Sequence, residues 1–219
     1  MTHPNVERVN AFVLVMAIQL VSLAVALAGL YFLDVEVLLV GHSATLAIAI
    51  GAVGALLSYA AAVGLTRSPT AVGRTLRRHC AELHPFFARF STPQIVLTAF
   101  AAGVCEELLF RGLLQPWLSE LTTPLLGLLG ASLLFGLLHY ASFTYFATIL
   151  LVGLILGICY RVTESLLCVI TWHAVYDLLA ITALARYPRV LGVPTARLDQ
   201  SPGNQSEYKT GHRERDHCE

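Results

Sequence analysis

Six runs of mostly apolar residues occupy most of this chain, and they constrain its fold more than any other feature. A helix that spans a bilayer needs about 20 predominantly apolar residues. The candidate spans are residues 10–33, 42–65, 94–118, 124–139, 143–162 and 165–185, of which the fourth is short. Only 13% of the 219 residues are charged, whereas soluble domains carry about 25%. We therefore expect an all-α, polytopic membrane bundle of about six transmembrane helices.

The basic residues are distributed unevenly along the chain. Residues 66–93 carry five arginines and six basic residues follow Ala185, whereas the connections 34–41 and 119–123 carry none. Because cytoplasmic connections are enriched in Lys and Arg, this predicts a multi-pass protein of the plasma membrane with both termini in the cytoplasm. Residues 10–33 exceed the roughly 7–15-residue apolar core of a signal peptide, so we interpret them as a retained helix. The net charge of zero gives no reason to expect a nucleic-acid partner.

The chain divides into three parts. Residues 1–93 contain two spans and an amphipathic cytoplasmic segment, residues 94–185 form a helical core, and residues 186–219 are a polar tail that we expect to be disordered. In the amphipathic segment, apolar residues recur every three or four positions, at Val72, Leu76, Cys80, Leu83, Phe87 and Phe90, and Pro85 interrupts the pattern. This is typical of a helix lying on the membrane surface. It could dock a substrate or serve only as a linker.

Few ionisable residues lie within the candidate spans. Placing one at bilayer depth costs about 3 kcal/mol on insertion scales, so such residues should face one another or a water-filled cavity. Apart from His42 and Arg161 at the ends of their runs, they are Glu106, Glu107, Arg111, His139, His173 and Asp177. Because they come from three different runs, their convergence would form a site within the membrane.

Helical spacing separates the two glutamates. Glu107 and Arg111 are four residues apart and share one face of a helix, which predicts an ion pair. Glu106 is rotated by about 100° from Glu107 and points away from that pair. An unpaired carboxylate in apolar surroundings is suited to act as a general base.

Two histidines supply partners for Glu106. His139 ends the fourth run, on the same face as Phe135. His173 and Asp177 are four residues apart, so both can enter one space, where Asp177 could orient His173 by accepting from its ring N–H. Such a set can activate a water and stabilise an oxyanion, or it can ligate a metal. A polar pair that only joins helices is the alternative for His173 and Asp177.

Three short motifs occur in order on separate apolar runs: EELLFR at 106–111, FGLLH at 135–139 and HAVYD at 173–177. Each is weak alone, but the ordered set resembles the motifs of the CPBP intramembrane proteases, the group of CAAX-processing and bacteriocin-processing enzymes. The resemblance covers roughly residues 94–185, which it would make the catalytic core.

The resemblance implies a role for each residue. Glu106 would activate water and His139 would hold that water. His173 and Asp177 would stabilise the tetrahedral oxyanion. Glu107 and Arg111 would brace the site. Many family members have Asn at the position of Asp177, and an ionised Asp would repel an oxyanion, so the role of Asp177 stays open.

The resemblance also implies a function, an intramembrane endopeptidase that cleaves a membrane-associated or lipidated protein, for example at a prenylated C-terminal tail. Membrane lipid would be its other partner. Zinc could be held by Glu106, His139 and His173, but the chain lacks an H-E-x-x-H motif, so we expect no obligatory metal. The residues are also compatible with a proton-coupled transporter, or with a non-catalytic immunity or scaffold protein that keeps the fold.

Overall fold

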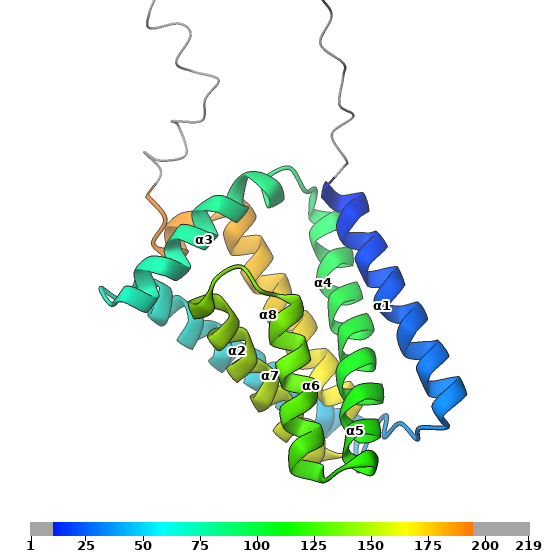
Figure 1. Ribbon diagram of the computed structural model, residues 1–219. Helices are drawn as coiled ribbons and strands as arrows, with labels where there is room; N and C mark the ends of the chain where they lie inside the picture. The colour runs from blue at the N-terminus through cyan, green and yellow to red at the C-terminus, as the bar shows by residue number, and fades with distance from the viewer. Residues whose placement is uncertain (1–10, 195–219) are drawn as a thin grey trace, which may run out of the picture.

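The computed structural model describes residues 11–194, and this part of the chain contains helices and no strand. The all-α fold expected from the sequence is therefore confirmed. The elements, shown in Figure 1, are α1 (Ala11–Leu33), α2 (Ala44–Arg67), α3 (Ala71–Phe87), α4 (Thr92–Glu107), the π-helix η1 (Leu108–Leu114), α5 (Gln115–Leu121), α6 (Pro124–Leu138), α7 (Phe143–Thr163), α8 (Leu166–Arg186) and the 3₁₀-helix η2 (Pro188–Leu191).

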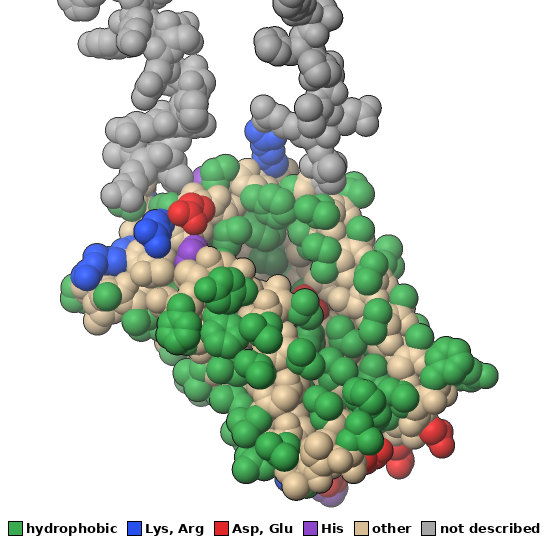
Figure 2. Space-filling view, in the orientation of Figure 1, with side chains coloured by type: hydrophobic (Ala, Val, Ile, Leu, Met, Phe, Trp, Pro, Cys, Tyr) green, Lys and Arg blue, Asp and Glu red, His purple; other side chains and the backbone are tan. Residues whose placement is uncertain are grey.

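The helices form a bundle whose outer surface is apolar. Within residues 11–194, α1, α2, α7 and α8 are each long and apolar enough to cross a membrane, and α6 is a shorter apolar helix of 15 residues. The elements α4, η1 and α5 follow one another without a break from Thr92 to Leu121. Exposed large apolar side chains cover most of the face seen in Figure 2. This surface suits lipid rather than water, because the exposed apolar patches of soluble monomers are small.

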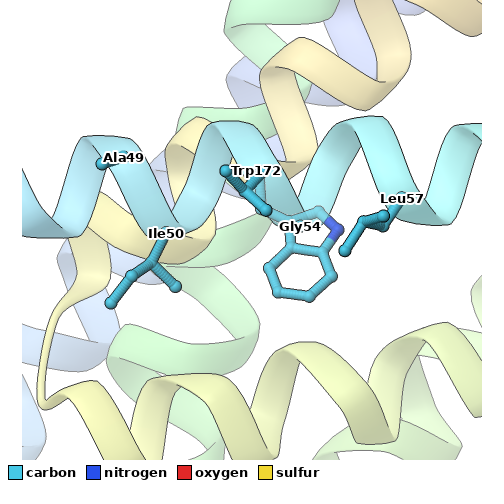
Figure 3. A pocket seen from close by; sticks show the side chains of 6 residues that line it. Ala49, Ile50, Gly54, Leu57 and Trp172 are labelled. Carbon is cyan, nitrogen blue, oxygen red and sulfur yellow. The ribbon is translucent and has the colours of Figure 1, made fainter.

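Helix α8 is held between α2 and α4, and its contact with α2 sets its rotation. The indole ring of Trp172 lies against Gly54 of α2 (Figure 3), where no larger residue would leave room for it. The Trp172 Nε1–H donates to Ser58 Oγ at 3.0 Å. Trp172 is thus a packing residue, and it fixes the direction in which the next residue, His173, points.

Helices α4 and α8 approach closely at Gly103. A Cβ atom on Gly103 would lie 2.8 Å from the Cβ of Ala174. This close approach places α4, which carries Glu106 and Glu107, directly beside the turn of α8 that carries His173.

Helix α3 crosses one end of the bundle (Figure 1). Its apolar stripe is largely covered by protein, because Leu76 is buried and Cys80 and Phe87 pack against α8 and the segment after it. Pro85 lies inside the last turn of the helix and does not end it. The His79 Nε2 lies 2.8 Å from Ser142 Oγ, the N-cap of α7, which ties α3 to the connection after α6.

The segment after α8 folds back onto the bundle. Residues 188–191 form η2, and Leu191 and Val193 are buried against α8. The predicted disorder of the tail falls mainly on residues 195–219, which lie outside the described residues.

Candidate active site

The connection from α6 to α7 reaches α3, where Ser142 Oγ lies 2.8 Å from His79 Nε2, and Figure 2 shows a hollow on this face beside α3. Helix α6 ends at Leu138, and its C-cap residue His139 lies where the chain leaves the helix. The side chains of His139 and Asp177 are 32% and 25% exposed, whereas those of Glu107 and Arg111 are 0% and 1% exposed. The ionisable residues thus form an accessible outer group and a fully buried inner group.

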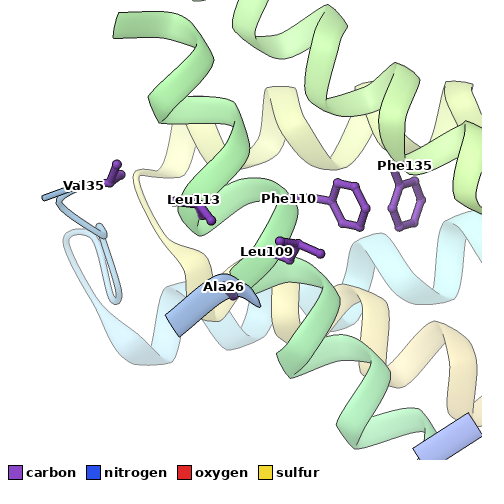
Figure 4. Packing of buried hydrophobic residues seen from close by; sticks show 6 residues of the cluster. All are labelled: Ala26, Val35, Leu109, Phe110, Leu113 and Phe135. Carbon is purple, nitrogen blue, oxygen red and sulfur yellow. The ribbon is translucent and has the colours of Figure 1, made fainter. Parts of the chain in front are cut away.

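The helix that carries both glutamates changes its winding at this point. Helix α4 ends with Glu106 and Glu107, and the next seven residues form the π-helix η1, which includes Arg111. Its apolar residues Leu109, Phe110 and Leu113 pack into a core cluster with Ala26 of α1 and Phe135 of α6 (Figure 4). π-Helical turns are rare and occur frequently at functional sites. This packing anchors the two glutamates between α1 and α6.

The inner group is centred on the carboxylate of Glu107. Its Oε1 accepts from Arg111 Nη1 at 2.7 Å and from His173 Nδ1 at 2.7 Å. The Arg111 Nη2 donates to the carbonyl of Gly153 in α7 at 3.0 Å. The structure therefore contains the ion pair expected from the spacing, and it adds a contact that the spacing did not predict, since Glu107 also orients His173.

The outer group is centred on Glu106. Its Oε2 lies 3.6 Å from His139 Nε2 and 4.0 Å from His173 Nε2. Its Oε1 accepts a hydrogen bond of 2.7 Å from Gln19 Nε2 of α1. Glu106 thus faces the two histidines and not Arg111, as the helical rotation between the adjacent glutamates led us to expect.

Both histidines present the same ring nitrogen to Glu106. The Nδ1 of His139 lies 2.8 Å from the backbone carbonyl of Phe135, and the Nδ1 of His173 contacts the Glu107 carboxylate. Because a carbonyl or carboxylate oxygen can only accept, each Nδ1 must carry a hydrogen. The Nε2 atoms are left to interact with Glu106, a water or a substrate.

The ring of Phe135 packs against Arg111 and against both histidines. Its ring centroid lies 4.7 Å from the Arg111 guanidinium, 4.7 Å from the His139 ring and 6.1 Å from the His173 ring. A cation over an aromatic face is stabilised by the ring quadrupole. Phe135 of the FGLLH motif therefore has a structural role, because its ring packs against the buried guanidinium of Arg111.

Asp177 makes a longer contact with His173 than Glu107 does. Its Oδ2 lies 3.6 Å from His173 Nε2, beyond normal hydrogen-bond distance, while Glu107 holds the opposite ring nitrogen at 2.7 Å. The Asp177 side chain is instead at the accessible edge of the outer group.

The side chains do not form a ready metal site. Zinc needs three donors about 2 Å from a common point. Among the described residues, no group of three or more His, Cys, Asp and Glu side chains is arranged to hold a metal ion.

Residues 88–179 match the model of a family described as type II CAAX prenyl endopeptidase Rce1-like. Residues 88–179 are thus similar to that family, and they are called the Rce1-like segment from here on. It includes all six ionisable residues and leaves out α1, α2 and α3. The resemblance read from the three motifs is thereby confirmed for residues 88–179, and the apolar helices are those of a membrane protein.

The chain also resembles a protein of Bacillus subtilis over part of its length. The uncharacterized protein YpbD of Bacillus subtilis (strain 168) is 31% identical over 94 residues, which is 42% of this chain and 46% of YpbD. The chain thus spans about half the length of this relative. No solved structure matches the chain.

Proposed function

We propose that this protein is an intramembrane endopeptidase that hydrolyses a peptide bond with a water activated by Glu106. The observation that carries the proposal is the convergence of Glu106 Oε2 with the Nε2 atoms of His139 and His173, at 3.6 and 4.0 Å. These separations are slightly too long for direct hydrogen bonds and leave each nitrogen free to bind a third group.

The first step follows from these contacts. A water between Glu106 Oε2 and His139 Nε2 attacks the carbonyl carbon of the scissile bond and gives one proton to Glu106. His139 suits the role of holding the water, because its Nδ1–H is committed to the Phe135 carbonyl and its Nε2 can accept from water. The product of this step is a tetrahedral oxyanion.

The oxyanion needs a donor, and His173 is placed to provide one. With Nδ1–H donated to Glu107, a second proton on Nε2 makes His173 an imidazolium that can donate to the oxyanion. Glu106 then returns its proton to the amide nitrogen, the C–N bond breaks, and an amine and a carboxylic acid leave. No external oxidant or cofactor is needed for this balance, and we propose that the reaction has no obligatory metal.

We further propose that the substrate is a membrane-associated or lipidated polypeptide. The hollow in Figure 2 opens on a face whose surroundings are apolar, so a substrate with a lipid chain can approach through the bilayer. The matching family is described as CAAX prenyl endopeptidases, which makes a prenylated C-terminal tail the first substrate to test.

The membrane placement that we propose has several spans, a plasma-membrane location and both termini in the cytoplasm. The start of α1, helix α3 and η2 lie at one end of the bundle (Figure 1), and the Lys and Arg side chains visible in Figure 2 gather mainly at that end. Basic residues favour the cytoplasmic side. Single cysteines introduced at residues 70 and 122 can be treated in intact cells with a thiol reagent that does not cross the membrane. The cysteine at residue 70 should stay unlabelled, and the cysteine at residue 122 should be labelled.

The test of the activity uses the purified full chain in lipid nanodiscs. A farnesylated peptide with a C-terminal CAAX sequence, its unprenylated counterpart and an unbiased peptide mixture are incubated with the wild-type protein. We expect cleavage by the wild type and none above background by Glu106→Ala or His139→Ala. If both variants cleave as well as the wild type, the mechanism is wrong. If the wild type instead shows pH-driven flux in liposomes that Glu106→Gln abolishes, the protein is a transporter.

A further inference from the structure

The hydrogen bond between Gln19 and Glu106 joins the outer group to a part of the chain that lies outside the Rce1-like segment. Gln19 comes from α1, 87 positions before Glu106, and donates its Nε2–H to Glu106 Oε1 at 2.7 Å. Gln19 is 5% exposed and is the only amide side chain in α1, which is otherwise strongly apolar. Among the described residues, no other side chain donates a hydrogen bond to Glu106.

The packing of α1 does not explain why residue 19 is a glutamine. The rest of α1 meets the bundle through apolar contacts, including Ala26 and the approach of Gly29 to Leu113. The Gln19 Oε1 is buried and accepts no hydrogen bond from the described residues. A half-satisfied buried amide is unfavourable. An apolar residue would dock the helix better, so the contact with Glu106 is the property that the amide supplies.

The contact also distinguishes the two oxygens of Glu106. Oε1 is held by Gln19, whereas Oε2 accepts no hydrogen bond from the described residues and points toward His139 and His173. A carboxylate free to rotate would present either oxygen in varying directions. A donor on one oxygen restricts the rotation and keeps the second oxygen aimed at the position of the attacking water.

We propose that Gln19 is a positioning residue for Glu106, so that α1 completes the active site of the Rce1-like segment. This inference rests on the proposed hydrolytic function. Gln19 acts through Glu106 and does not itself touch the substrate. Its amide is neutral, so it orients the carboxylate without giving it a countercharge.

The experiment compares Gln19→Met with the wild type, using whichever peptide the wild type cleaves. Met has a similar length and no donor, and Gln19→Leu is a second variant in case Met alters packing. The matched control is Leu20→Ala, because Leu20 is the next residue of α1 and is 62% exposed on the outer surface. For each protein, kcat and KM are measured per folded molecule in nanodiscs, together with the unfolding temperature.

We expect both Gln19 variants to lose about 10- to 100-fold in kcat, as for a hydrogen bond to a charged group, with KM within about twofold because the substrate is not contacted. Their unfolding temperature should stay within a few degrees of the wild-type value, because the hydrogen bond lost by Glu106 is offset by the removal of a half-satisfied buried amide. Leu20→Ala should match the wild type in kcat and KM. The inference is overturned if kcat per folded molecule is unchanged, or if it falls only together with the unfolding temperature. An inactive wild type would overturn the proposed function as well.

Discussion

Glu106 and Glu107 are adjacent in the sequence, yet replacing each by glutamine should have opposite consequences. Both substitutions keep the shape of the side chain and remove its charge. Glu107 lies 2.7 Å from the Arg111 guanidinium at 0% exposure, whereas Glu106 has no Arg or Lys partner among the described residues. Glu107→Gln should therefore damage stability, and Glu106→Gln should damage only activity.

The magnitude for Glu107→Gln follows from the surroundings of Arg111. Breaking a buried ion pair by removing one partner costs about 3–5 kcal/mol, because the other charge stays buried without compensation. Arg111 would keep its hydrogen bond to the Gly153 carbonyl and its contact with the Phe135 ring, so we expect the lower end, about 3 kcal/mol. For a protein of this size, that corresponds to a fall in unfolding temperature of about 6–12 °C.

Glu106→Gln should change the unfolding temperature by less than about 2 °C, because its Oε1 can still accept from Gln19. Hydrolysis should fall by about 10²–10⁴-fold through loss of the general base. Glu107→Gln should also slow hydrolysis, by about 10- to 100-fold, since His173 loses its charged partner.

The assay is thermal unfolding in detergent, followed by intrinsic tryptophan fluorescence, with peptide hydrolysis measured on the same samples. The decisive control is the double variant Glu107→Gln, Arg111→Met, which removes both buried charges and should recover at least half of the lost stability. Failure of the double variant to recover would refute the ion-pair reasoning. So would a Glu106→Gln protein that unfolds at a lower temperature than Glu107→Gln.

Three further outcomes are expected. Gly103→Ala should lower the unfolding temperature by several degrees and slow hydrolysis, because its Cβ would lie 2.8 Å from that of Ala174, whereas Gly64→Ala, which would meet no atom within 4 Å, should be neutral or slightly stabilising. Asp177→Asn should keep or increase kcat, since it removes a negative charge near the oxyanion; a kcat below a tenth of the wild-type value would contradict this. Chelation with 1,10-phenanthroline should leave the rate within about twofold, with metal content measured in parallel; complete inhibition reversed by zinc would show a metalloenzyme.

The helices of this protein were predictable because the apolar runs that indicate them are long. Each of the six apolar runs corresponds to one helical segment, since an apolar run of about 20 residues has few alternatives to a helix in lipid. The amphipathic helix α3 was predictable from its spacing, but the surface that its stripe contacts was not. Cys80 and Phe87 pack against residues 183–193, and no local pattern indicates that this late segment folds back.

The sequence predicted those contacts of the site that lie within a single helix. The spacing of Glu107 and Arg111 predicted their contact, and the rotation of Glu106 away from them was also expected. Contacts between helices were not predictable in the same way. The hydrogen bond of His173 to Glu107 depends on the approach of α8 to α4, and that of Gln19 depends on where α1 docks. In the sequence, Gln19 is noticeable only as an amide within an apolar span, and this does not indicate which residue it contacts.

The partners of the two glutamates explain how one helix can carry a structural and a chemical carboxylate side by side. Glu107 is fully buried beside the Arg111 cation, and its Oε1 already accepts from Arg111 Nη1 and His173 Nδ1, so it is placed to hold these side chains rather than to contact a water. A glutamate that takes a proton from water needs a hydrogen-bond donor that fixes the orientation of its carboxylate but carries no positive charge. The neutral amide of Gln19 meets this requirement at Glu106. An arginine or lysine in place of Gln19 should therefore hold Glu106 more tightly and still abolish hydrolysis, and retention of activity by Gln19→Lys would contradict this account of which glutamate is the base.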